Sequence, residues 1–181
     1  MELGTSILSI SFLLISKSFD NQVPRTRNYV DKSSFIARPG RSSYSASKFA
    51  IEAIHESLSH ELATFNIKIL IVEPGAFRTP FASRIITPSQ HESTGGFSEA
   101  YKGTVLEQMV SGWKGFKGVP DFIKGDPEKA ANAIVTAVGT GHKFLRLVLG
   151  RDCVKAMEDK IGELTRDLEA TRKIAMGTDI D

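Results

Sequence analysis

Tyr44 and Lys48, four residues apart in the run "SSYSASKF", are the side chains whose types and spacing best suit catalysis. Residues spaced i, i+4 share one face of a helix, so these two side chains can meet. A tyrosine alone is a poor acid or base near neutrality because its pKa is about 10. A nearby ammonium group favours the phenolate and lowers that pKa. The pair can then exchange a proton with a substrate oxygen at ordinary pH.

The same spacing also occurs on ordinary helices, where both side chains only decorate a solvated face. Two neighbouring features favour the catalytic interpretation. Residues 45–47 are small and let another part of the structure approach the helix closely, and Pro74-Gly75 follows the next apolar run. Binding sites in α/β sheets lie beyond the carboxyl ends of strands, and Pro74-Gly75 marks such an end.

The elements that must position the pair follow from hydrophobic periodicity. From Ser45 onward, the apolar steps predict a helix of about five turns whose core-facing residues are Ile51, Ile54, Leu58, Leu62 and Phe65. Residues 67–73, "IKILIVE", form a continuous apolar run that is typical of a parallel strand covered on both faces. The pair and Pro74-Gly75 therefore belong to adjacent elements.

Further helices and strands follow along the chain. Asp126-Pro127-Glu128 indicates a helix start, with an acidic N-cap and proline at the first position. Residues 144–150 predict a second buried strand. A C-terminal helix carries an apolar seam of Val154, Met157, Ile161, Leu164 and Leu168, which we expect to join the core or, in a fragment, to serve for pairing. Between Pro74-Gly75 and this helix start at Asp126, residues 80–125 contain many glycines and aromatic residues, a composition that suits a lid. The alternation of strands and helices predicts an α/β fold with a parallel sheet.

The run from Ser42 to Thr79 closely resembles the catalytic region of short-chain dehydrogenase/reductases, with their Y-x-x-x-K helix, buried strand and P-G-x-x-x-T loop. The resemblance continues through "GDPEKAANAIVTAV" and "LRLVLGRD" and covers residues 33–181. It implies the C-terminal catalytic half of one domain, truncated at the N-terminus. The expected fold is a partial Rossmann-like, doubly wound parallel sheet that lacks the N-terminal dinucleotide-binding strands. Residues 1–32 form a divergent segment of uncertain structure.

The resemblance implies an NAD(P)-dependent oxidoreductase that interconverts an alcohol and a carbonyl by hydride transfer. Tyr44 would be the general acid or base, and Lys48 would lower its pKa and hold the nicotinamide ribose. Pro74 and Gly75 would lie against the nicotinamide, and Thr79 would bind its carboxamide or a phosphate.

The family's carbonyl-orienting serine matches Ser34, although the spacer "FIARPGRSS" is a few residues shorter than usual. A surface loop serine is the alternative interpretation of Ser34. The cofactor that we expect is NADP rather than NAD. The charge after the family's second strand, which sets that choice, is not identifiable in this sequence.

One family feature is absent from the sequence. The G-x-x-x-G-x-G turn that cradles the cofactor pyrophosphate has no counterpart before Tyr44. Without the strands that normally flank them, residues 67–73 are expected to expose an edge or a face. The alternative function is therefore a catalytically inactive fragment that acts as a binding or oligomerisation module.

Composition limits the partners and the compartment. A net charge of +2 without charge runs argues against nucleic acid, and the single cysteine, Cys153, suits a reducing, cytoplasmic compartment. No metal spacing is present. The apolar residues 5–16 are too short for a membrane span, and acidic Glu2 replaces the basic region of a signal peptide. We expect a small lipophilic alcohol or carbonyl substrate, and a homo-oligomer formed through the Tyr44–Phe65 helix.

Overall fold

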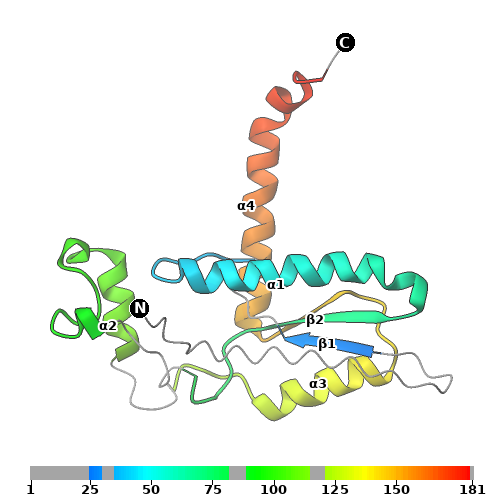
Figure 1. Cartoon of the computed structure of the whole chain (residues 1–181), viewed down its shortest axis with the longest axis horizontal. Helices are drawn as coiled ribbons and strands as arrows, with labels where there is room; N and C mark the ends of the chain where they lie inside the picture. Colours follow the sequence, from blue (N-terminus) through cyan, green and yellow to red (C-terminus); the bar gives the residue numbers. More distant parts are fainter. Residues whose placement is uncertain (1–24, 30–34, 82–88, 115–120, 180–181) are drawn as a thin grey trace, which may run out of the picture.

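A three-stranded parallel sheet forms the centre of the molecule. The computed structural model describes residues 25–29, 35–81, 89–114 and 121–179. The strands are β1 (Arg25–Tyr29), β2 (Lys68–Pro74) and β3 (Arg146–Leu149), in the order β1-β2-β3. Helix α1 (Ser42–Glu61) lies along one face of the sheet and α3 (Pro127–Gly139) along the other (Figure 1). The predicted α/β class with a parallel sheet is confirmed.

Strand β2 is fully enclosed. Its residues pair with β1 from Lys68 to Val72 and with β3 from Ile71 to Pro74. The side chains of residues 69–73 are at most 4% exposed. The expected uncovered edge was therefore wrong. Residues 25–29, a segment without clear periodicity, supply the second neighbouring strand.

The two faces of β2 contact different helices. Ile69 and Ile71 pack against Ile51, Leu58 and Leu62 of the α1 region. Leu70 and Val72 pack against α3 through Ile134 and Val138. A strand alternates its side chains between faces, so a continuous apolar run is what a strand between two helices requires.

Two residues predicted to face the core on α1 do not. Ile54 is 54% exposed and Phe65 is 68% exposed. At about 100° per residue, Ile54 is rotated about 60° from Ile51 and lies at the rim of the packed stripe. Phe65 ends the short 3-10 helix η2 (Ala63–Phe65), beyond the end of α1.

The predicted start of α3 is confirmed. The Asp126 carboxylate accepts hydrogen bonds from the backbone N–H groups of Glu128, at 2.9 Å, and Lys129, at 3.3 Å. Pro127 occupies the first turn, where its missing N–H would have no helical partner. The cap fixes where the chain turns back under the sheet.

The segment between β2 and α3 contains short helical pieces. These are η4 (Ser89–His91), η5 (Glu99–Tyr101) and α2 (Val105–Lys114). Part of the predicted lid, residues 82–88 and 115–120, lies outside the described residues. A lid role for residues 80–125 stays a prediction.

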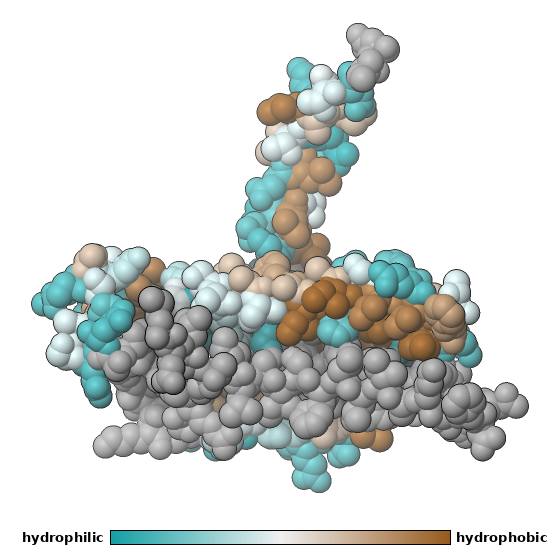
Figure 2. All heavy atoms as spheres, viewed as in Figure 1, coloured by the Kyte–Doolittle hydropathy of each residue, from teal (hydrophilic) through white to brown (hydrophobic). Residues whose placement is uncertain are grey.

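Helix α4 (Arg151–Met176) projects from the body of the molecule (Figure 1). Cys153 in its first turn is fully buried, whereas Ile161, Leu164 and Leu168 are each more than half exposed. Val154 is exposed as well, and only Met157 of the five seam residues is half-buried, so the expectation that the seam belongs to the core was wrong. Figure 2 shows the seam as an apolar stripe on the surface of α4. In the part of the chain that the structure describes, no helix is long and apolar enough to cross a bilayer.

Candidate active site

Tyr44 and Lys48 lie in the first turns of α1, where the sequence predicted that they would share a face. The Lys48 Nζ atom is 5.5 Å from the centroid of the Tyr44 ring. Lys48 is only 7% exposed and Tyr44 is half-buried. An ammonium group removed from water acts more strongly on a neighbouring phenol than a solvated one does. The helical spacing therefore produces a partly desolvated Tyr-Lys pair.

The small residues between Tyr44 and Lys48 have a structural use. Ser45 is 3% exposed, so the body of the protein approaches α1 closely at this point. The Ser47 hydroxyl donates a hydrogen bond to the Tyr44 carbonyl at 2.7 Å. A larger side chain at Ser45 would separate the helix from its support.

The loop after β2 is held by the β3–α4 connection. The Gly75 N–H donates to the Leu149 carbonyl at 2.7 Å, and the Ala76 N–H donates to Asp152 Oδ2 at 2.9 Å. Both amides belong to the P-G-x-x-x-T segment that the sequence indicated. Its backbone direction is fixed at the residues where the chain leaves the sheet.

The same loop is attached on its other side to residues 123–125. Phe77 forms a β-bridge with Gly125, and the Arg78 N–H donates to the Gly125 carbonyl at 2.9 Å. The Arg78 guanidinium donates to the Ile123 carbonyl at 3.3 Å. A Cβ at residue 125 would collide with the Ala76 carbonyl, so this contact requires glycine.

The end of the loop reaches the Tyr-Lys pair. The rings of Tyr44 and Phe81 are 6.4 Å apart between centroids and are tilted by 53°. The structure thus brings Tyr44, Lys48 and the end of the loop together. Pro74, Gly75 and half-buried Thr79 lie in this loop, but their predicted contacts with a cofactor stay predictions. Ser34 lies outside the described residues.

An ion-pair cluster that we did not predict ties α1 to β3. Arg146 donates through Nε to Glu52 at 2.6 Å and through Nη2 to Glu56 at 2.7 Å. Burial lowers the pKa of Arg146, but the hydrogen bonds and charges of the two carboxylates outweigh it and leave that pKa raised. In the sequence, the only sign of this cluster was the i, i+4 spacing of Glu52 and Glu56, which places both carboxylates on one face of the helix.

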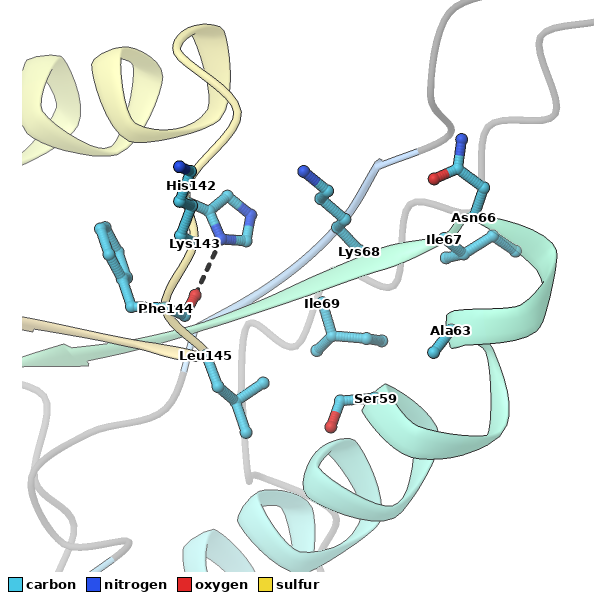
Figure 3. Close-up of a pocket in the computed structure, with 10 residues that line it drawn as sticks. All are labelled: Ser59, Ala63, Asn66, Ile67, Lys68, Ile69, His142, Lys143, Phe144 and Leu145. Carbon is cyan, nitrogen blue, oxygen red and sulfur yellow. Dashed lines mark hydrogen bonds between the residues drawn. The ribbon is translucent and has the colours of Figure 1, made fainter.

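A hollow of about 380 Å³ lies at the opposite end of the sheet (Figure 3). Lys68 and Ile69 at the start of β2, and Lys143 and Phe144 before β3, contribute to its lining. The nearby His142 donates from Nδ1 to the Phe144 carbonyl at 2.8 Å. Because β2 begins here and ends near Tyr44, this hollow is separate from the candidate site. Among the described residues, no group of His, Cys, Asp or Glu side chains could hold a metal ion.

Comparison with known proteins agrees with this geometry. The family described as short chain dehydrogenase matches residues 31–89. The oxidoreductase BOA17 of Botryotinia fuckeliana (strain B05.10) is 30% identical over 144 residues, covering 79% of this chain and 48% of that protein. The crystal structure of a short-chain dehydrogenase from Streptomyces avermitilis is similar, with a TM-score of 0.64 and 32% identity. That match covers 87% of this chain and 53% of the other.

The chain belongs to the short-chain dehydrogenase/reductase family. A further relative, Retinol dehydrogenase 7 of Mus musculus, is 26% identical over 114 residues, which cover 60% of this chain and 35% of that protein. The chain spans about half the length of the fungal oxidoreductase that it matches.

Proposed function

We propose that the chain is an NAD(P)-dependent oxidoreductase that interconverts an alcohol and a carbonyl, with Tyr44 as the general acid or base. The observation that carries this proposal is the buried Lys48 ammonium beside the half-buried Tyr44 ring, with 5.5 Å between Nζ and the ring centroid. The membership of an oxidoreductase family supports it.

Each residue of the site has a proposed task. The Tyr44 hydroxyl gives a proton to the carbonyl oxygen during reduction and takes it back during oxidation. Lys48 favours the phenolate of Tyr44 and donates to ribose hydroxyls. Pro74 and Gly75 present backbone to the nicotinamide, and Thr79 offers a hydroxyl to its carboxamide or to a phosphate. Ser34 orients the substrate carbonyl.

The residues present fit one end of the cofactor. The Tyr-Lys pair and the Thr79 hydroxyl would supply donors for a nicotinamide riboside, and bound NAD(P) would supply or accept the hydride. No G-x-x-x-G-x-G segment for the pyrophosphate occurs in the 181 residues. We therefore expect weak cofactor binding, and we propose NADP as the preferred form.

The proposed substrate is a small lipophilic alcohol or carbonyl compound. Phe81, whose ring lies beside Tyr44, is 53% exposed. Exposed aromatic side chains near a reactive pair favour an apolar ligand over a charged one. The similarity to a relative named as a retinol dehydrogenase supports the same substrate class.

The compartment, the organisation and the assembly are also proposals. We propose the cytoplasm, because the chain has a single cysteine, Cys153, and that cysteine is buried. Residues 33–181 are proposed as one catalytic unit, although β1 brings part of residues 1–32 into the same sheet. A homo-oligomer would use the outer face of α1, where Phe49 is exposed, and its rim, where Ile54 is exposed.

The alternative function is a binding or oligomerisation module without catalysis. The missing glycine-rich turn and the exposed apolar residues of α1 and α4 favour it. Such a module would use α1 as an interface and would retain Tyr44 and Lys48 without turnover.

Replacing Tyr44 with Phe distinguishes the two functions. The variant keeps the ring and its contact with Phe81 but loses the proton, so reduction of lipophilic aldehydes should fall by about a hundredfold or more. NADPH oxidation followed by absorbance measures the rate. Tyr101→Phe is the matched control, since Tyr101 is exposed on η5 and should keep full activity. Equal rates in Tyr44→Phe and the unmodified chain would overturn the assignment.

A further inference from the structure

Asp152 reaches from the first turn of α4 to the loop that follows β2. Its Oδ2 atom accepts the hydrogen bond of the Ala76 N–H at 2.9 Å, across 76 positions of sequence. A hydrogen bond to a charged acceptor is stronger than one between neutral groups. The start of α4 is therefore attached to the candidate site through a side chain, in addition to the sheet.

Two glycines make room for this carboxylate. A Cβ at residue 75 would overlap Asp152 Oδ1, and a Cβ at Gly150 would lie 2.9 Å from the same atom. Gly150 also has φ +95°, a backbone conformation that other residues adopt at a cost. The carboxylate thus occupies the space that side chains at residues 75 and 150 would need. The contact with Asp152 therefore explains why residue 75 is a glycine.

The connection between β3 and α4 holds two consecutive amides of the loop that follows β2. The Gly75 N–H bonds to the last residue of β3, Leu149, and the Ala76 N–H bonds to Asp152 three residues later. Pro74 and Leu149 are also partners in the sheet register. Removal of Asp152 would leave Gly75 attached and would release the backbone one residue further along.

We propose that Asp152 is a positioning residue for the cofactor-facing loop at residues 74–79. It holds the Ala76 amide and keeps the backbone of Gly75 in the shape that meets the nicotinamide end of the cofactor. The role in cofactor binding rests on the proposed function above. Asp152 acts through the loop backbone.

The attachment is tested without any ligand. In Asp152→Ala, hydrogen exchange of the Ala76 amide, followed by NMR of the full chain, should accelerate by at least about tenfold. Asp152→Asn keeps an acceptor oxygen and should retain most of the protection. Asp159→Ala, which removes only an exposed ion pair with Lys155, should leave the Ala76 amide unchanged. An unchanged Ala76 amide in Asp152→Ala would overturn the proposal.

The positioning role is tested by cofactor binding. The Kd for NADPH should rise about tenfold in Asp152→Ala and stay near the original value in Asp152→Asn. Gly75→Ala alone should weaken binding because its Cβ meets the Asp152 carboxylate, and the Gly75→Ala/Asp152→Ala double variant should lose less than the sum of the two effects. Circular dichroism and thermal unfolding check that each variant folds.

The outcomes separate this inference from the proposed function. If the unmodified chain binds NADPH and Asp152→Ala binds it equally well, the positioning role is overturned and the proposed function stands. If the unmodified chain binds neither NADPH nor NADH, the proposed function fails and the cofactor role of Asp152 fails with it. Accelerated exchange at Ala76 would still establish the attachment of the loop in that case.

Discussion

Lys48 is the residue whose environment most needs explanation. A lysine with 7% exposure has lost most of its hydration, which is costly for an ammonium group. Tyr44 lies beside it on the same face of α1. In the proposed function, the ammonium group of Lys48 acts on this neighbouring phenol.

Arg146 has a structural role that complements this pair. Its guanidinium bridges Glu52 and Glu56 and so fastens the middle of α1 to the sheet. Its raised pKa means that the stabilisation is fully present below the unfolded-state pKa and is lost only as the pH rises through the folded-state value, in strong alkali. The Arg146 guanidinium therefore keeps its part in this stabilisation until the pH is strongly alkaline.

Replacing Arg146 with Met removes both ion pairs and leaves the Glu52 carboxylate without its Arg146 partner. We expect the free energy of unfolding to fall by about 1–3 kcal/mol, measured by urea denaturation. Arg172→Met is the matched control, because Arg172 lies on exposed α4 and pairs only within that helix, with Glu169. A control that loses as much stability as Arg146→Met would contradict this account.

The residues of the site differed in how far the sequence could predict them. Tyr44 and Lys48 are four positions apart, so helical geometry alone predicts their meeting. Asp152 and Ala76, or Arg146 and Glu52, meet only because the fold brings distant segments together. No local pattern contains that information, and both contacts were missed.

Among the elements, β2 and α3 were the most predictable. A short apolar run needs cover on both faces, and α1 and α3 supply it. The Asp126 cap could be predicted because an aspartate before the first helical residue accepts hydrogen bonds from the first backbone N–H groups of the helix. The seam on α4 misled the prediction, because periodicity indicates an apolar face without showing whether anything covers it.

The cap of α3 gives a direct test at this scale. Asp126→Ala removes the acceptor for two N–H groups and should lower the free energy of unfolding by about 1 kcal/mol. Chemical denaturation measures the change, and Asp121→Ala in the exposed turn before α3 should be nearly neutral. Equal effects of the two substitutions would argue against the cap.

At the scale of the whole molecule, two features depend on segments that the sequence described poorly. Strand β1 encloses β2 although residues 25–29 show no clear periodicity, since pairing with the main chain does not require an apolar pattern. Helix α4 leaves the body with its apolar stripe exposed (Figure 2). The fold class was predictable because the central strand and its two helices carry strong patterns.

The molecule as a whole also determines how tightly a cofactor can bind. The loop after β2 is fastened on two sides, to β3 and α4 and to residues 123–125, while the Tyr-Lys pair lies at its end. In the proposed function, the nicotinamide end of a dinucleotide would meet this preorganised loop, whereas the pyrophosphate end would find no glycine-rich turn in the 181 residues. Binding should be measurable and weak.

The most direct test of this account is a titration of the purified chain with NADPH and NADH, followed by nicotinamide fluorescence, in the unmodified chain and in Lys48→Met and Tyr44→Phe. We predict saturable binding that is weakened about tenfold or more in Lys48→Met and little changed in Tyr44→Phe. Lys155→Met, which changes an exposed lysine on α4, should bind as the unmodified chain does. Absence of binding by a folded sample, or equal binding by Lys48→Met, would contradict the assignment of Tyr44 and Lys48 to a cofactor site.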